Sequence, residues 1–133
     1  MSLDHVNIAT PDAERDAALF ADLFGLPVHH RTEVADQGVK VVKLDLGNSV
    51  LEFTEPTHDD SPVGRFLAKN RPGLHHICLR VDDIRAKVAE LEEKGVRVVN
   101  REPTIGASGH PIVFLHPKST AGVLVELVER PNS

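Results

Sequence analysis

The chain has 133 residues, of which 41% are hydrophobic, 26% charged and 4% aromatic, and its formal net charge is −5. This acidic balance and the scarcity of aromatic side chains exclude the basic, base-stacking surfaces that are typical of nucleic-acid binders. The one cysteine, Cys78, excludes an internal disulfide framework and fits a reducing cytoplasm.

No apolar run approaches the roughly 20 residues needed to span a bilayer. The first residues resemble neither a signal peptide nor a transit peptide. A chain of this length is expected to bury about 65–70% of its unfolded surface, so one domain can fold without a structural metal. We therefore expect a cytoplasmic, single-domain protein that acts on a small molecule and contacts neither nucleic acid nor membrane.

The first half of the chain is predicted to contain a strand, a helix and three further strands. Residues 3–9 alternate polar and apolar side chains, which favours a strand. Thr10 and Pro11 predict the start of a helix, with Thr10 as its N-cap, and Gly25 predicts its end. Three strand-like runs follow at residues 28–34, 39–46 and 50–55.

A connector over residues 57–73 carries a short helix capped near Ser61, and the pattern then restarts. The expected elements are a strand at 74–81, a helix at 82–94, and strands at 96–100, 111–115 and 123–128. The sequence thus predicts two β-α-β-β-β modules in one domain, the first over about residues 1–56 and the second over about 74–131.

The repeat places a histidine and a glutamate at equivalent positions of the two modules. It sets His5 on His76 in the first strands, and Glu52 on Glu126 in the last strands. A single histidine or glutamate in a strand is usually structural or solvated. Four such residues at equivalent positions of apolar strands instead indicate a divalent-metal site with two nitrogen and two oxygen ligands, because a carboxylate buried without a partner is costly.

Several segments carry a resemblance to a known family. They are Asp4-His5-Val6, Gln37-Gly38-Val39, Asp60-Ser61-Pro62, Gly73-Leu74-His75-His76-Ile77 and His116-Pro117-Lys118-Ser119, followed by residues 122–127. With them the chain resembles the vicinal-oxygen-chelate superfamily, and within it the methylmalonyl-CoA epimerase family. The resemblance implies an α+β fold, in which the mixed sheets of two tandem β-α-β-β-β modules form a curled, barrel-like cleft around one metal.

The resemblance also implies a site, a substrate and an assembly. His5, Glu52, His76 and Glu126 fall on the family's metal positions, and Co²⁺, Mn²⁺, Ni²⁺ and Zn²⁺ all accept such ligands. The implied partners are an acyl-CoA substrate and a second copy of the chain in a homodimer. The implied reaction is epimerisation of (R)- and (S)-methylmalonyl-CoA through removal and return of the C2 proton.

The proton carriers are expected to be Glu126 and Glu52. At the position of Val41, some family members carry a glutamate that is thought to be one of the two proton-transfer bases. Because valine cannot carry a proton, we infer that Glu52 takes this role here. The expected substrate contacts are Lys43, Lys118 and Ser119, with Lys43 either reaching the cleft or lying on the solvated surface.

Two other functions fit the same fold. Lactoylglutathione lyase (glyoxalase I), or another metal-dependent isomerase or lyase of the superfamily, would use the same four ligands, but glyoxalase I typically has a different turn from His116-Pro117-Lys118-Ser119. A non-catalytic ligand-binding protein of this superfamily would usually lack the metal set, which is complete here.

Overall fold

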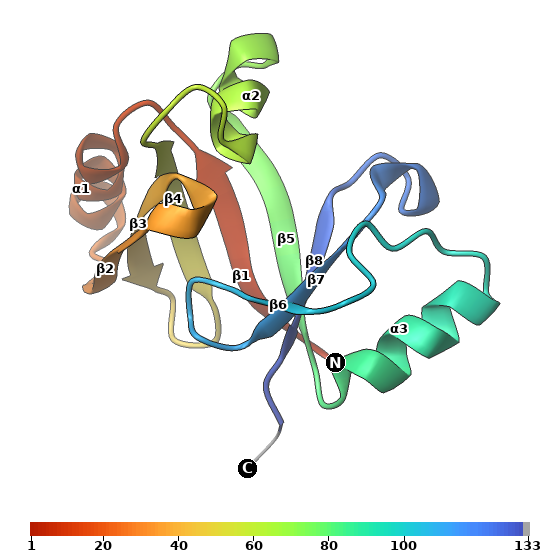
Figure 1. Cartoon of the computed structure of the whole chain (residues 1–133). Coiled ribbons are helices and arrows are strands. Elements are labelled where there is room, and N and C mark those ends of the chain that lie inside the picture. Colours follow the sequence, from red (N-terminus) through yellow and green to blue (C-terminus); the bar gives the residue numbers. More distant parts are fainter. Residues whose placement is uncertain (132–133) are drawn as a thin grey trace. The chain divides into compact units, whose positions relative to one another are not determined.

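The computed structural model describes residues 1–131, which form eight strands, three α-helices and two 3-10 helices (Figure 1). In chain order the elements are β1 (Ser2–Ala9), α1 (Ala13–Phe24), β2 (Val28–Val34), η1 (Ala35–Gln37), β3 (Val39–Asp45), β4 (Val50–Pro56), α2 (Pro62–Lys69), β5 (Gly73–Val81), α3 (Ile84–Glu93), β6 (Thr104–Ile105), β7 (Pro111–Leu115), η2 (Pro117–Ser119) and β8 (Val125–Glu129).

The chain divides into two compact units, one over residues 5–75 and the other over residues 1–4 together with the chain from 76 onward. In the first unit the strands are ordered β2-β3-β4-β1, and β1 is parallel to β4 while the other pairs are antiparallel. In the second unit the order is β6-β7-β8-β5, and β5 is parallel to β8. The identical orders and directions confirm the two predicted β-α-β-β-β modules and the α+β class.

The sheet of the first unit is packed on both faces. On one face α1 covers a cluster that includes the fully buried Leu44 and Phe53. On the other face α2 contributes Val63 to a cluster with Val39 and Val41. Because successive strand residues point to opposite faces, the second face is also the one that carries Glu52.

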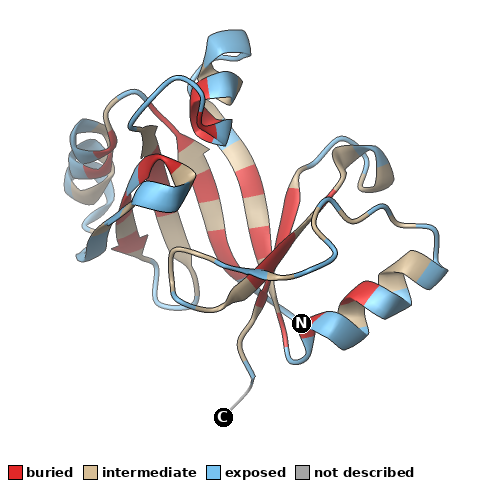
Figure 2. Ribbon diagram, viewed as in Figure 1, coloured by how far each residue is buried: buried red, intermediate tan, exposed pale blue. Residues whose placement is uncertain are grey.

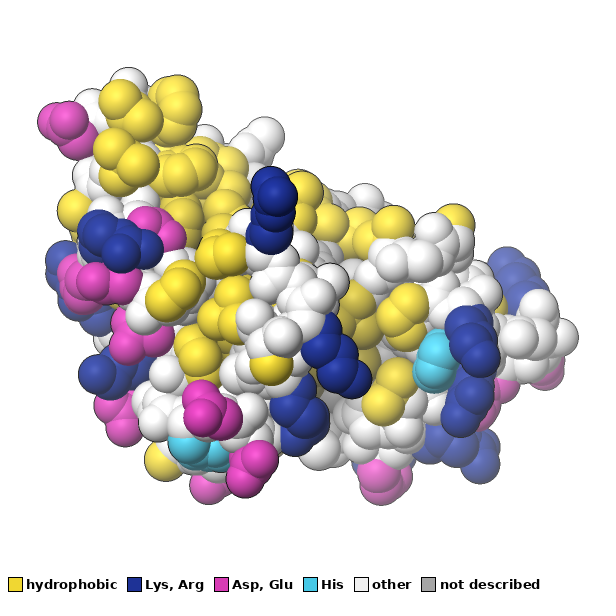
Figure 3. All heavy atoms as spheres, turned by 90° about the horizontal axis from the view of Figure 1, so that it is seen from above, with side chains coloured by type: hydrophobic (Ala, Val, Ile, Leu, Met, Phe, Trp, Pro, Cys, Tyr) yellow, Lys and Arg dark blue, Asp and Glu magenta, His cyan; other side chains and the backbone are white. Residues whose placement is uncertain are grey.

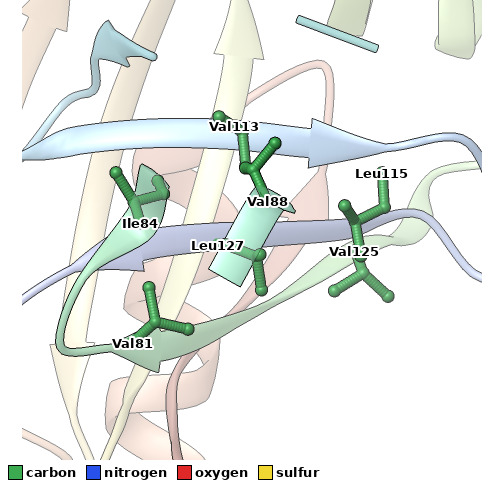
Figure 4. Packing of buried hydrophobic residues seen from close by; sticks show 7 residues of the cluster. All are labelled: Val81, Ile84, Val88, Val113, Leu115, Val125 and Leu127. Carbon is green, nitrogen blue, oxygen red and sulfur yellow. The ribbon is translucent and has the colours of Figure 1, made fainter. Parts of the chain in front are cut away.

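In the second unit α3 packs against one face of its sheet. Figure 4 shows the seven buried side chains of this cluster, which are Val81, Ile84, Val88, Val113, Leu115, Val125 and Leu127. Burial follows the strands and the inner face of each helix (Figure 2), as apolar periodicity predicts.

Two local predictions were wrong. Helix α1 is capped by Asp12, whose carboxylate accepts the N–H of Arg15 at 3.1 Å, and not by Thr10. Residues 96–100 form no strand and contribute only one bridge, from Val98 to Leu115, because the Asn100 side chain accepts the N–H of Phe114 and takes the place of a ladder partner. The edge strand is instead β6, which is only two residues long.

The surface carries both signs of charge. Basic and acidic side chains are intermingled on the face drawn in Figure 3. Exposed ion pairs such as Arg31–Glu14 (2.6 Å) and Arg85–Glu102 (2.8 Å) contribute little to stability. Within residues 1–131, no helix is long and apolar enough to cross a membrane.

Thr10, which does not cap α1, makes a side-chain hydrogen bond that leads to a prediction about stability and pH. The buried Thr10 hydroxyl donates a hydrogen bond to Asp16, and this bond lowers the pKa of that carboxyl below its usual value of 3.8. A lowered pKa in the folded state stabilises the protein above the unfolded-state pKa, and the contribution is lost as pH falls through the folded-state pKa. Thr10→Val should therefore destabilise the protein by about 1 kcal/mol at neutral pH and by less under strongly acidic conditions.

Urea unfolding at neutral and at strongly acidic pH measures the destabilisation by Thr10→Val under each condition. Thr57→Val, at an exposed threonine, is the control. Equal destabilisation by Thr10→Val at both pH values would contradict the assigned role of the Asp16 bond.

Candidate active site

The first histidine–glutamate pair lies on adjacent parallel strands of the first unit. His5 is on β1 and Glu52 is on β4, and the register pairs Asn7 with Glu52. His5 Nε2 lies 3.5 Å from Glu52 Oε1, and the two side chains are 9% and 8% exposed. An imidazole and a carboxylate are thus held together out of bulk water.

Further polar side chains surround Glu52. Asn7 Nδ2 donates to Glu52 Oε1 at 2.9 Å and to Thr54 Oγ1 at 2.6 Å. Lys43 Nζ lies 3.7 Å from Glu52 Oε2, and the lysine side chain is only 11% exposed. Both carboxylate oxygens therefore face donors, and Lys43 belongs beside Glu52 and not on the solvated surface.

Asn7 and Thr54 were not among the predicted site residues. Each follows a predicted ligand by two residues in the same strand: Asn7 follows His5, and Thr54 follows Glu52. Since alternate strand residues share a face, this spacing was the available signal.

The second pair is built in the same way in the second unit. His76 Nε2 lies 2.8 Å from Glu126 Oε1, and the two side chains are 8% and 9% exposed. The register of β5, β8 and β7 places Cys78 and Phe114 on either side of Glu126. The Phe114 ring meets the His76 ring edge to face, with centroids 5.4 Å apart.

The donor chemistry of the two pairs fits a divalent metal. Each pair brings an imidazole nitrogen and a carboxylate oxygen close together, and all four side chains are buried. Nitrogen and oxygen donors of this kind suit Co²⁺, Mn²⁺, Ni²⁺ and Zn²⁺. A charge-neutralising cation would also compensate the cost of burying two carboxylates.

The other expected substrate contacts lie apart from these pairs. Lys118 and Ser119 form part of η2; the Lys118 side chain is exposed, and Ser119 Oγ accepts the N–H of Arg97 at 2.9 Å. Both residues follow β7 and precede β8, the strand that carries Glu126. Val41 is 2% exposed and belongs to the apolar cluster under α2.

Comparison with known proteins places this arrangement in a family. A sequence profile of the glyoxalase/bleomycin resistance protein/dioxygenase superfamily matches residues 4–114. The mitochondrial methylmalonyl-CoA epimerase of Homo sapiens is 46% identical over 126 residues, which cover 94% of this chain and 72% of the human protein. The chain belongs to the methylmalonyl-CoA epimerase family of this superfamily.

Bacterial relatives and solved structures agree. The ethylmalonyl-CoA/methylmalonyl-CoA epimerase of Cereibacter sphaeroides is 45% identical and covers 94% of this chain and 95% of its own. A methylmalonyl-CoA epimerase solved in complex with methylmalonyl-CoA and NH₄⁺ has a TM-score of 0.90 at 41% identity, covering 96% of this chain and 93% of its own. Membership of this family implies a divalent metal ion, which the two buried pairs fit.

The hydrogen bond from Asn7 to Glu52 generates a stability prediction. Asn7→Leu removes a donor from a buried carboxylate and should cost about 1–3 kcal/mol of unfolding free energy. The same substitution in a Glu52→Gln background should cost less, because the charge that the amide stabilises is gone. A double-mutant cycle by urea unfolding of the metal-free protein measures the coupling.

Equal costs of Asn7→Leu in the two backgrounds would mean that the amide does not act on Glu52. Thr54→Val is the matched control, since it removes only the other acceptor of the same amide.

Proposed function

We propose that the chain epimerises (R)- and (S)-methylmalonyl-CoA at C2. The observation that carries the proposal is the pair of buried histidine–glutamate contacts, His5–Glu52 and His76–Glu126, at equivalent positions of two matching modules. Relatives named methylmalonyl-CoA epimerase, 43–46% identical over nearly the whole chain, support the choice of substrate and reaction.

The two modules act, in this proposal, as one domain with one metal site. His5, Glu52, His76 and Glu126 would together hold a single divalent ion, which is Co²⁺, Mn²⁺, Ni²⁺ or Zn²⁺. When bound, such an ion stabilises the negative charge that develops on substrate oxygens as the C2 proton leaves.

Glu126 and Glu52 are proposed as the proton carriers. Inversion at C2 requires one group that removes the proton from one face and another that returns a proton to the opposite face. The symmetry of the modules supplies one carboxylate from each, and Val41 cannot serve as a base. Because donors face both oxygens of Glu52, its orientation is fixed more firmly than that of an unsupported carboxylate.

The remaining parts of the proposal concern partners and location. An acyl-CoA is the substrate, and Lys118 and Ser119 on η2 are proposed contacts for its anionic tail. A homodimer, which the resemblance implies, is proposed as the assembly. Because the sequence has one cysteine, Cys78, it has no internal disulfide, which fits the proposed cytoplasmic location.

Proton exchange tests the function directly. Methylmalonyl-CoA incubated with the metal-loaded protein in D₂O should gain deuterium at C2, as followed by NMR, while its two epimers equilibrate. Absence of both signals would refute the proposal. Turnover of the glutathione–methylglyoxal hemithioacetal, with none of methylmalonyl-CoA, would instead assign the chain to glyoxalase I and leave the metal site in place.

Two substitutions separate the roles of the carboxylates. Glu126→Gln is nearly isosteric and should lower epimerisation by about 100-fold or more, as expected for loss of a general acid–base. Glu52→Gln can still coordinate through oxygen but cannot carry a proton. It should therefore abolish epimerisation while exchange from one epimer continues through Glu126. Glu102→Gln, at an exposed carboxylate paired with Arg85, is the control.

Near-normal epimerisation by Glu52→Gln would show that Glu52 is only a ligand and that another group returns the proton.

A further inference from the structure

A row of polar side chains crosses the sheet of the first unit. The registers pair His30 with Lys43, Lys43 with Glu52, and Glu52 with Asn7, so the row runs over β2, β3, β4 and β1. Residues paired in register point to the same face. The row therefore begins at Asn7, passes through Glu52 and Lys43, and ends at the exposed His30.

Lys43 is the one cation in this row with a fixed charge. Its side chain is 11% exposed, and its Nζ lies 3.7 Å from Glu52 Oε2, which is longer than a hydrogen bond. Within residues 1–131, Lys43 Nζ donates no hydrogen bond. The ammonium is thus held beside Glu52 while its three N–H groups remain able to bind another acceptor.

The second unit has no such charge at the equivalent place. Lys43 pairs with Glu52 across β3 and β4, and Phe114 pairs with Glu126 across β7 and β8. Likewise Asn7 corresponds to Cys78, since these two pair with Glu52 and Glu126 in turn. The modules share their histidine–glutamate pairs but differ in the neighbours of each carboxylate.

A lysine beside a metal ligand is unfavourable for a bound cation and favourable for a bound anion. Two carboxylates and a divalent ion sum to zero charge, so the Lys43 ammonium leaves one positive charge uncompensated. A carboxylate of the substrate would neutralise it. The low exposure of Lys43 limits screening by water and salt, whereas Lys118 is exposed and its attraction for an anion is weaker.

We propose that Lys43 binds the free carboxylate of the substrate's acyl group and so sets the preference for malonyl-type acyl-CoA. This inference rests on the proposed function and names which part of the substrate faces the first module. Glu52, held by Asn7 at its other oxygen, keeps the ammonium in place until the substrate carboxylate arrives.

Binding of two ligands to two proteins tests the inference without turnover. Methylmalonyl-CoA and propionyl-CoA differ by one carboxylate, and calorimetry measures the Kd of each for the Mn²⁺-loaded wild type and for Lys43→Met. Lys43→Met should raise the Kd of methylmalonyl-CoA about 10- to 100-fold and leave the Kd of propionyl-CoA unchanged. Lys43→Arg keeps the charge and should restore most of the difference.

Lys40→Met, at an exposed lysine of the same strand, should change neither affinity and serves as the matched control. Titration of Mn²⁺ into the same variants gives a second readout, because loss of the neighbouring positive charge should not weaken the metal. Equal weakening of both ligands, or weaker Mn²⁺ binding in Lys43→Met, would overturn the inference and make Lys43 a support for Glu52 alone. A wild type that binds both ligands as expected but exchanges no C2 proton would refute the proposed function and not this inference.

Discussion

Each module buries a carboxylate in the middle of an apolar strand. The free-energy cost of this burial constrains which side chains the neighbouring strands can place beside it. An isolated buried carboxylate is strongly unfavourable, so the neighbouring strand must supply a partner. His5 meets Glu52 across β1 and β4, and His76 meets Glu126 across β5 and β8. Parallel pairing of the first and last strand of each module is what brings the partners together.

The remaining elements serve this pairing. Helices α1 and α3 cover the faces of the two sheets that carry apolar side chains, including Phe53 in the first unit and Leu127 in the second. The opposite face of each sheet carries the histidine–glutamate pair beside a smaller apolar cluster, which includes Val41 in the first unit and Ile112 in the second. Repetition of one module gives two similar carboxylates, and different neighbours, Lys43 beside one and Phe114 beside the other, allow them different roles.

Much of this organisation could be predicted from the sequence, because strand alternation and module repetition are local patterns. The choice of His5, Glu52, His76 and Glu126 as candidate ligands followed from their equivalent positions in the repeat. Their division into a His5–Glu52 pair and a His76–Glu126 pair depends on the strand registers. The position of Lys43 could not be decided, since a lysine on a strand face is solvated or buried according to its cross-strand neighbour, and that neighbour depends on register.

The errors have similar causes. Thr10 has the sequence features of an N-cap, yet its hydroxyl donates a hydrogen bond to Asp16. The N-cap is Asp12, two residues later, because aspartate also favours this position. Residues 96–100 have strand-like side chains, but Asn100 replaces a ladder bond with a side-chain bond. Such competition between local hydrogen bonds is settled by tertiary contacts that the sequence does not display.

The central proposal is that one divalent ion is held by His5, Glu52, His76 and Glu126 together. Calorimetric titration of Co²⁺ into the metal-free wild type, His5→Ala and His76→Ala tests it most directly. The account predicts a single binding site per chain in the wild type and a large loss of affinity at that same site in both variants. Two independent sites in the wild type, one removed by each substitution, would contradict it.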